Sequence, residues 1–334
     1  MIPPKPHGLL SALFLSSVCL AVALVAATPA AGESEFPKRP VKLIAPFAPG
    51  GVADVAARLI SAVASKNLGG SIIVDNKVGA GGNIGAQIVA AAPADGYSLL
   101  FAGLPMITST LTSKDVGYDL LKDLTPVCGG IAFDSVFVTS KATGIKSIRT
   151  LKDRIADGGA FVSYGTAGIN TPSHFMSAWL AHLAGGQAEA VHYRGGSGLM
   201  TDVASGRLTY AAATLPVALA QRDELTILAS LSKERLAQLP DVPSMVDAGM
   251  PDYVSADWTV WMAIYAPTNT PRPIIDKLYT AYNAALQTPD LKAALRVYAM
   301  DPMVGYTSDR LATFQKEQFV TWKAVLDKLG VVTE

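Results

Sequence analysis

A unit of short apolar segment, glycine-containing turn and helix recurs along this sequence and constrains its fold more than any other feature. In the first copy, the apolar run Val41–Ala45 precedes the turn Pro49-Gly50-Gly51, and a helical pattern starts at about Ala53. Apolar runs that alternate with helical patterns are typical of βαβ units, in which helices cover parallel strands on both faces. The sequence therefore predicts an α/β fold.

The alternation continues along the chain as two βα-rich groups, and the last third is more helical. The further predicted strands are 71–75, 98–101, 160–164, 190–193, 208–213, 225–229 and 260–265. The further predicted helices are 83–92, 147–156, 171–183, 196–204, one behind Pro271 and Pro273, and one from about Ser308. Two groups of this kind favour two sheets over one long sheet.

The first helix carries apolar residues at a spacing of four. Val55, Leu59 and Val63 recur in this way, and this spacing places side chains on one face of a helix. We expect these three residues to form its buried face, with Asp54 and Ser61 facing elsewhere.

The N-terminal segment is typical of an export signal. Lys5 precedes the uncharged apolar run Leu9–Ala27, and small residues follow up to Gly32. We predict that residues 1–31 form a signal peptide, cleaved between Ala30 and Gly32. A retained membrane anchor is the alternative, because roughly 19 apolar residues can just span a bilayer.

The charge balance excludes several classes of partner. The sequence holds 27 basic and 27 acidic residues, and removal of the signal takes away only Lys5. A nearly neutral protein has little electrostatic attraction to nucleic acid or to an anionic membrane surface. No later apolar segment reaches spanning length, so a soluble mature chain is expected. Only Cys128 then remains, which leaves no intrachain disulfide.

Four glycine-containing loops are candidates for ligand binding, because each joins a predicted strand to a predicted helix. The first N–H groups of a helix have no partners inside it, and glycine lets a ligand approach the backbone closely. The helix dipole adds attraction for an anion. The loops are 46–54, 78–83, 163–174 and 192–197. One such loop is most simply a tight turn, but four suggest a shared cleft.

Nucleotide, metal and catalytic sites find little support in the sequence. The glycine loops lack the spacing of dinucleotide and P-loop motifs, so no nucleotide cofactor is expected. His174, His182 and His192 lack metal-ligand spacing, and Cys128 lacks evident activation. We therefore predict no metal, no cofactor and no enzymatic activity. His174, in the first turn of a helix, remains open between ligand contact and a structural role.

Short motifs follow one another in a fixed order through the mature chain. They are Phe36-Pro37-Lys38-Arg39-Pro40, Pro46-Phe47 with Pro49-Gly50-Gly51, Asp54, Ala57-Arg58, Gly79-Ala80-Gly81-Gly82-Asn83-Ile84-Gly85, Pro93-Ala94-Asp95-Gly96-Tyr97, Ser163-Tyr164, Ser173-His174, Tyr193-Arg194-Gly195, Leu239-Pro240-Asp241-Val242-Pro243-Ser244, and Trp261 with Ala266-Pro267. Each motif is weak alone, but the ordered set is specific. Through it the chain resembles the substrate-binding receptors of tripartite tricarboxylate transporters, also called Bug receptors.

The resemblance implies a two-lobed periplasmic-binding-protein fold of the Venus flytrap, type II-like kind. Each lobe would be a mainly parallel sheet flanked by helices, with crossing strands between the lobes. We expect residues 36–130 and 255–334 to form lobe 1 and residues 131–254 to form lobe 2. The resemblance also implies a periplasmic protein, expected to be monomeric, that captures a small carboxylate for integral-membrane transporter subunits.

The candidate ligand-binding residues lie mainly in the glycine-containing loops. They are Phe47, Pro49, Gly50, Gly51, Asp54, Gly81, Gly82, Tyr164, Thr166, Ala167, Asn170, Ser173, His174, Tyr193, Gly195 and Thr214. Closure is expected to bring Gly50, Gly51 and Asp54 opposite Thr166, Ser173 and His174. We predict that Asp54 orients the first loop or receives a ligand donor, and does not act as a base.

The sequence departs from the family pattern at two positions. Ala213-Thr214 stands where the family often has an acidic residue and Asn, and Ala263 stands where Gly is common after Trp261. The first change predicts a less polar environment for the distal end of the ligand. Two alternatives stay open: a sensor that presents the ligand to a signalling partner, and an exported hydrolase or isomerase that uses His174 with Asp54.

Overall fold

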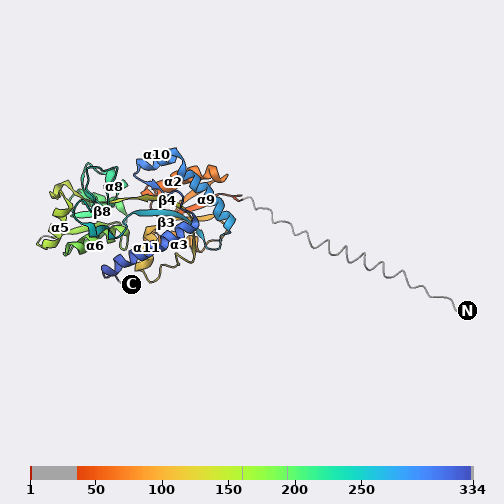
Figure 1. Ribbon diagram of the computed structural model, residues 1–334, viewed down its shortest axis with the longest axis horizontal. Helices are drawn as coiled ribbons and strands as arrows, with labels where there is room; N and C mark the ends of the chain where they lie inside the picture. The colour runs from red at the N-terminus through yellow and green to blue at the C-terminus, as the bar shows by residue number, and fades with distance from the viewer. Residues whose placement is uncertain (2–35, 160, 194, 332–334) are drawn as a thin grey trace. The chain divides into compact units, whose positions relative to one another are not determined.

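The computed structural model describes Met1 and residues 36–159, 161–193 and 195–331. Its contacts divide the chain into the units Met1–Lys38 and Arg39–Glu334, and the described helices and strands lie in the second unit (Figure 1). The predicted signal peptide and its cleavage site lie outside the described residues. The same holds for Ala160 and Arg194, which belong to the predicted strand 160–164 and the loop 192–197.

The first sheet is mixed and joins the two ends of the sequence. Among the described residues it has six strands in the order β11-β4-β10-β3-β1-β2. β1 is parallel to β2 and β3, whereas β10 runs antiparallel to both β3 and β4, and β11 runs antiparallel to β4. The bounds are β1 Val41–Ala45, β2 Ile72–Asn76, β3 Ser98–Gly103, β4 Leu124–Phe133, β10 Val260–Pro267 and β11 Asp301–Pro302.

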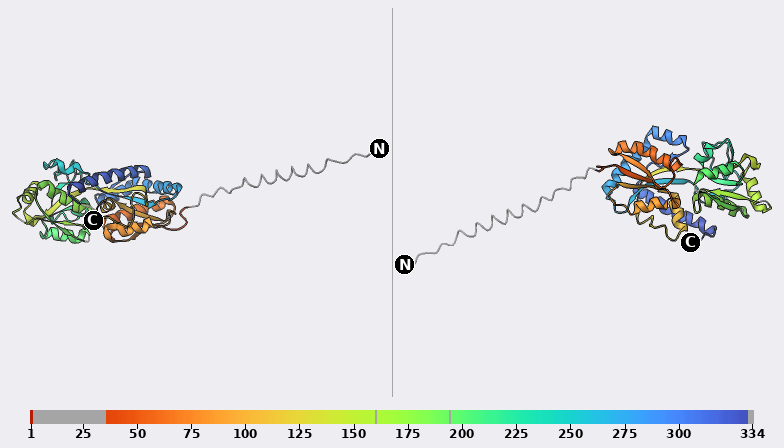
Figure 2. Two further views of the ribbon diagram at one scale, coloured as in Figure 1. Left: turned by 90° about the horizontal axis from the view of Figure 1, so that it is seen from below. Right: turned by 180° about the vertical axis from the view of Figure 1, so that it is seen from behind.

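The second sheet is built from the middle of the chain. Its described strands follow the order β7-β6-β8-β5-β9, with β6 parallel to β7 and β8 and with β5 antiparallel to β8 and β9. The bounds are β5 Ser135–Ser140, β6 Ser163–Thr166, β7 Glu189–His192, β8 Tyr210–Thr214 and β9 Leu225–Ser230. Figure 2 shows this sheet in yellow to blue-green, beside the orange and blue segments of the first.

Helices flank both sheets, and the α/β prediction is confirmed. The expectation of mainly parallel sheets is wrong, because β10 in the first sheet and β5 in the second run antiparallel to both of their neighbours. The bounds are α2 Val52–Leu68, α3 Asn83–Ala90, α4 Leu104–Thr112, α5 Ile148–Asp157, α6 Pro172–Ala184, α7 Gly196–Ala204, α8 Leu215–Ala220, α9 Arg272–Gln287, α10 Pro289–Val297 and α11 Ser308–Lys328, with the short 3₁₀ helices η1 Ala80–Gly82, η2 Lys141–Thr143 and η3 Pro251–Ser255. Sequence periodicity did not predict α4, α8, α10, β4, β5 or β11. Among the described residues, no helix is long and apolar enough to cross a membrane.

The two sheets define two lobes, which the chain connects through crossing segments. It passes from β4 to β5 at Asp134 and returns after η3 into β10. The predicted lobe boundary after residue 130 falls inside β4, and the exact boundaries remain a prediction. The last helix contacts both sides, since Trp322 of α11 packs against Phe175 of α6, with ring centroids 6.4 Å apart, and Phe314 of α11 packs against Trp261 of β10 at 5.1 Å.

The buried face of α2 differs from the predicted one. Val55, Leu59 and Val63 are only partly buried, and Ser61, expected to face elsewhere, is 2% exposed. The residues that are buried are mostly small: Ala53, Asp54, Ala56, Ala57, Ile60, Ser61, Ala64 and Leu68. α2 packs against both β2 and α9, and small side chains allow this close packing. The prediction followed the spacing of the larger apolar residues and was wrong, because the alanines that form the buried face contribute little to a hydrophobic pattern.

Candidate functional site

The helices that follow the parallel strands of the first sheet start at glycines. Gly51, Gly82 and Gly103 are the N-cap residues of α2, α3 and α4, and none of these ends has a side-chain cap. By contrast, Ser147 and Thr307 cap α5 and α11 through their hydroxyl oxygens. Because β1 is parallel to both β2 and β3, the carboxyl ends of these three strands lie at the same edge of the sheet. The uncapped starts of α2, α3 and α4, which follow the strands, therefore share that edge.

The loops after β1, β2 and β3 meet at this edge. A Cβ built on Gly82 would lie 2.5 Å from Cε of Met106 in α4 and 3.5 Å from Cβ of Pro46. Asn83, at the start of α3, donates from Nδ2 to Oγ of Ser109 in α4 at 2.7 Å. The three loops therefore form one connected surface. A side chain at position 82 would be strained, because Gly82 has φ +106°, and it would displace the end of the Met106 side chain.

The carboxylate of Asp54 is saturated by donors from the protein. This residue lies in the first turn of α2 and is 3% exposed. Oδ2 accepts from the Gly50 N–H at 2.9 Å and from Arg58 Nε at 3.0 Å. Oδ1 accepts from Asn76 Nδ2 at 2.8 Å and lies 2.9 Å from Arg58 Nη2. A carboxylate offers about four acceptor positions, so little capacity remains for a ligand donor.

The electrostatics of Asp54 agree with a fixed, ionised carboxylate. Burial alone would raise the pKa of Asp54, but hydrogen bonds from Arg58, Gly50 and Asn76, together with the charge of Arg58, hold this pKa below its ordinary value. A carboxylate in this state is a poor general base. The geometry fits the first predicted role of Asp54, which was to orient the loop.

The hydrogen bonds of the first loop leave specific backbone donors available. The Gly50 N–H bonds to Asp54, and the Gly51 N–H bonds to the Ala48 carbonyl at 3.2 Å. The next two N–H groups, of Val52 and Ala53, make no hydrogen bond to any other described residue. The start of α2 therefore presents donors one and two residues beyond the Gly-Gly pair.

In the second lobe, the loops after β6 and β7 are fastened to each other. The N–H groups of Tyr193 and Gly195 donate to the carbonyls of Thr166 and Ala167, at 3.0 and 3.1 Å, and extend the pairing of the two strands. Oγ1 of Thr166 lies 2.8 Å from Nδ1 of His192. Two of the predicted ligand loops are thus held together as one rigid edge.

Ser173 and His174 brace the loop that leads into α6. The Ala167 N–H donates to Oγ of Ser173 at 3.0 Å, and the Asn170 N–H donates to Nδ1 of His174 at 3.3 Å. Burial, with a smaller contribution from His192, lowers the pKa of His174 to about 4. Because Nδ1 accepts a hydrogen bond, we assign the proton of the neutral ring to Nε2. His174 can therefore offer a neutral N–H donor.

Aromatic rings surround His174. The Tyr164 ring stacks on it with centroids 6.3 Å apart, and the His192 ring meets it edge-on at 4.9 Å. Phe175 lies beside it and also contacts Trp322 of α11. These contacts fix the orientation of the imidazole.

The predicted site residues fall into two groups at the carboxyl ends of strands. Phe47, Pro49, Gly50, Gly51, Asp54, Gly81 and Gly82 belong to the first lobe, and Tyr164, Thr166, Ala167, Asn170, Ser173, His174, Tyr193, Gly195 and Thr214 belong to the second. Two second-lobe hydroxyls are already engaged: Thr166 is fully buried, and Tyr193 donates to Asp202 at 2.6 Å. Whether each residue contacts a ligand remains a prediction.

The sequence reasoning missed Asn76. This residue ends β2, and its Nδ2 donates to both the Phe47 carbonyl, at 3.0 Å, and the Asp54 carboxylate. Its place as a polar residue at the carboxyl end of a parallel strand was the available signal.

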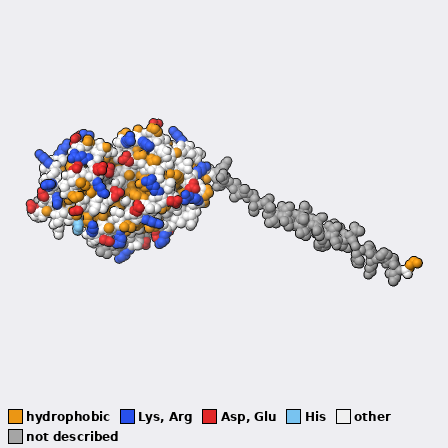
Figure 3. Space-filling view, in the orientation of Figure 1, with side chains coloured by type: hydrophobic (Ala, Val, Ile, Leu, Met, Phe, Trp, Pro, Cys, Tyr) orange, Lys and Arg blue, Asp and Glu red, His pale blue; other side chains and the backbone are white. Residues whose placement is uncertain are grey.

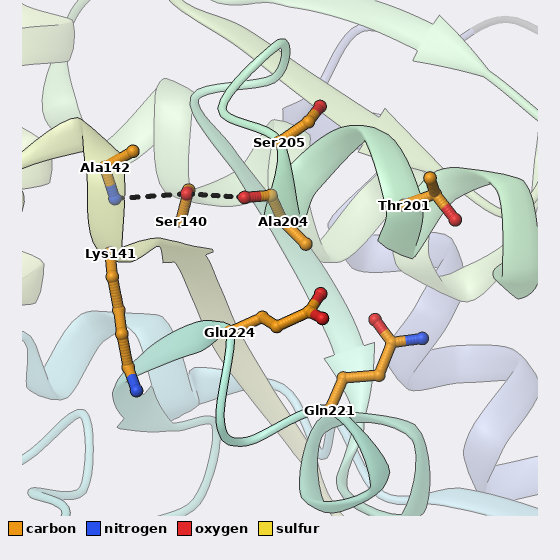
Figure 4. A pocket seen from close by; sticks show the side chains of 8 residues that line it. All are labelled: Ser140, Lys141, Ala142, Thr201, Ala204, Ser205, Gln221 and Glu224. Atoms are coloured by element: carbon orange, nitrogen blue, oxygen red, sulfur yellow. Dashed lines mark hydrogen bonds between the residues drawn. The ribbon is translucent and has the colours of Figure 1, made fainter.

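Other parts of the described chain offer no comparable chemistry. No group of three or more His, Cys, Asp or Glu side chains among the described residues could hold a metal ion. A shallow pocket lies at the opposite end of β5 from the strand end that pairs with Thr214, and is lined by Ser140, Lys141, Ala142, Thr201, Ala204, Ser205, Gln221 and Glu224 (Figure 4). It contains none of the predicted site residues. Figure 3 shows basic and acidic side chains interspersed on the face in view.

Comparisons with known proteins identify the family. Residues 56–331 match the family described as "Tripartite tricarboxylate transporter family receptor". A relative in Pseudomonas sp. (strain P51), named "UPF0065 protein in tcbD-tcbE intergenic region", is 30% identical over 93% of this chain and 92% of its own length. These matches confirm the resemblance derived from the ordered motifs.

Solved structures share the two-lobed fold. The periplasmic binding protein BugD superposes with a TM-score of 0.81 at 26% identity, over 90% of this chain and 100% of its own. A Rhodopseudomonas palustris protein solved with adipate gives 0.82 at 29% identity, over 90% and 100%. MatC from the same organism, solved with bound malate, gives 0.79 at 27% identity, over 87% and 100%.

Proposed function

Since this chain belongs to the tripartite tricarboxylate transporter receptor family, whose members are periplasmic solute-binding proteins, we propose that it captures a small carboxylate between its lobes. We further propose that it does so in the periplasm, as a monomer, and delivers the acid to membrane transporter subunits. The two neighbours solved with adipate and malate support the ligand class.

The start of α2 is the observation that carries this proposal. A carboxylate that leaves water needs donors to replace its hydration. The uncapped N–H groups of Val52 and Ala53 supply them, and the helix dipole adds favourable charge. The nearby Asp54 carboxylate would repel an acid, but the guanidinium of Arg58 offsets its charge and its oxygens already accept from the protein.

The second lobe completes the proposed site from the opposite side. On closure, the loop with Thr166, Ser173 and His174 would face Gly50 and Gly51. The neutral His174 ring would donate from Nε2 to an acid oxygen without introducing a positive charge. The aromatic rings around it favour an apolar ligand body, which agrees with the Ala213-Thr214 departure from the family pattern.

Binding without turnover is better supported than catalysis. A hydrolase or isomerase that used His174 with Asp54 would need one of them to exchange a proton near neutral pH. Both pKa values are lowered, and the oxygens of Asp54 are occupied. A sensor that presents the same ligand remains the second candidate, because its binding site would be identical.

Thermal unfolding of the protein with a panel of mono-, di- and tricarboxylates tests the proposal. A ligand that binds only the native state stabilises it by about 2.7 kcal/mol at 100 times its dissociation constant, enough to shift the melting temperature by several degrees. We expect a selective shift, larger for adipate than for malate. A panel without any shift would contradict a carboxylate receptor. Much tighter binding of malate than of adipate would contradict the prediction that the distal end of the ligand lies in a less polar environment.

A further inference from the structure

We infer that Asn76 is a positioning residue for the ligand loop of the first lobe, acting through Asp54 and the Phe47 carbonyl. The inference rests on the proposed function and adds a residue that the ligand-loop motifs do not contain. Asn76 need not touch the ligand. It would set the geometry of the segment from Phe47 to Ala53, which carries the donors.

Three hydrogen bonds place Asn76 at the junction of the loop, the helix and the next strand. Nδ2 donates to the Phe47 carbonyl at 3.0 Å and to Oδ1 of Asp54 at 2.8 Å. Its Oδ1 accepts from Arg58 Nη2 at 2.9 Å. Both amide hydrogens and the amide oxygen are therefore used.

These bonds tie the two ends of the loop together. Phe47 lies at its start and Asp54 in the first turn of α2, so one side chain fixes their separation. The backbone of Asn76 is itself held, because it pairs with Ala45 in the β1–β2 ladder. The loop is thereby anchored to the sheet at a point outside its own sequence.

The loop needs such an anchor because its turn is intrinsically flexible. Gly50 has φ +76°, a backbone conformation that glycine adopts readily, and Gly51 follows directly. The only side-chain bond to the Gly50 N–H in the described structure comes from Asp54. If Asn76 is removed, Asp54 loses a partner and the Phe47 carbonyl is released. A ligand would then pay the entropy of ordering the loop when it binds.

Asn67, which lies on α2 as Asp54 does, provides a matched control. It lies near the C-terminal end of α2, and its Nδ2 donates to the Ala281 carbonyl at 3.1 Å. Asn67→Ala removes one side-chain to backbone bond of the same kind and leaves the ligand loop intact. A purely structural role for Asn76 would make the two variants alike in ligand binding.

The test measures acid binding by calorimetry, with adipate and malate as probes, in wild type, Asn76→Ala and Asn67→Ala. For Asn76→Ala we expect affinity to fall by about tenfold or more, and for Asn67→Ala to stay within about twofold. Asn76→Ser, which keeps one donor, should fall between wild type and Asn76→Ala, and it serves if Asn76→Ala fails to fold. Equal affinities in wild type and the Asn76 variants would overturn the inference.

A spectroscopic measurement on the ligand-free protein separates positioning from general destabilisation. In ¹⁵N–¹H spectra, the Gly50 amide should shift and exchange faster with solvent in Asn76→Ala and Asn76→Ser than in wild type or Asn67→Ala. An unchanged Gly50 amide in both Asn76 variants would overturn the inference while the carboxylate receptor function stood. Failure of every acid to bind wild type would instead overturn the proposed function, and the inference with it.

Discussion

The backbone N–H of Asn170 donates a hydrogen bond to Nδ1 of His174 at 3.3 Å. This bond stabilises the neutral ring, because a protonated imidazole carries a hydrogen at Nδ1 and cannot accept there. Burial and the neighbouring His192 act in the same direction, and the pKa of His174 falls to about 4. The second-lobe edge is thus built to hold a neutral histidine.

This arrangement predicts a loss of stability in mild acid. The unfolded chain takes up a proton at His174 below its ordinary pKa of about 6.5, whereas the folded chain does so only near 4. The contribution of the neutral His174 ring to the free energy of unfolding is fully present above the pKa that His174 has in the unfolded chain. It is lost as the pH falls towards the pKa of His174 in the folded chain. At pH 5 the loss relative to neutral pH amounts to about 2 kcal/mol.

Urea unfolding at neutral and acidic pH measures this effect, and His174→Gln should remove that part of the pH dependence. An NMR titration of the imidazole gives the pKa directly. A midpoint near 6.5 for the native His174 ring would contradict the prediction.

Replacement of Asp54 should weaken acid binding. Asp54→Ala removes the acceptor that holds the Gly50 N–H and frees both Arg58 and Asn76. The disordered loop must then be fixed by the ligand, so we expect affinity to fall by about tenfold or more in a calorimetric titration.

Asp276 on α9 offers the control for this variant. It accepts from Arg272 Nε at 2.8 Å, also four residues away on a helix, and it holds no loop. Asp276→Ala should leave acid binding unchanged. Unchanged affinity in Asp54→Ala would refute the orienting role.

Gly103→Ala should destabilise the protein. A Cβ at this position would overlap the carbonyl oxygen of Trp261 in the neighbouring strand β10, and backbone atoms cannot rotate away. We expect a loss of at least about 2 kcal/mol in the free energy of unfolding. Gly159→Ala is the control, since its Cβ would meet open space, and it should stay within about 0.5 kcal/mol. Similar stabilities in the two variants would contradict this packing.

The thiol of Cys128 should be inert in the native protein. It is buried in β4, and burial raises its pKa to about 12, so almost no thiolate forms at neutral pH. In a chain that starts after residue 31, Ellman's reagent should modify this thiol only after denaturation. Rapid native-state labelling would contradict the burial.

Local sequence was enough to predict the elements that carry the site. The predicted helix 196–204 matches α7, and the predicted strand 41–45 matches β1. Both elements are determined by residues close together in sequence. A glycine marks where a strand ends and a helix begins, and the spacing of the apolar residues distinguishes strand from helix. The order of the motifs likewise identified the family without any tertiary information.

The crossing segments could not be predicted in the same way. β4 contains Pro126 and the pair Gly129-Gly130, which local propensity disfavours in a strand. Pro126 and Gly129 nevertheless pair with β10 from the last third of the chain, and Gly130 lies at a register shift in this ladder. Glycine is required at position 130, because the Cβ of any other residue would collide with the Met262 carbonyl oxygen. Such pairing depends on contacts between residues far apart in sequence, and no local pattern records them.

The sequence by itself determined that this chain has glycine turns at the starts of helices, an α/β order of elements and a receptor's motifs. Only the tertiary structure decided which donors those turns leave available, and that Asn76 and Asp54 fix the first loop. It also decided which face of α2 is buried. The reason is physical: turns and helices follow from the conformational preferences of adjacent residues, whereas hydrogen bonding and burial depend on which distant residues the fold brings into contact.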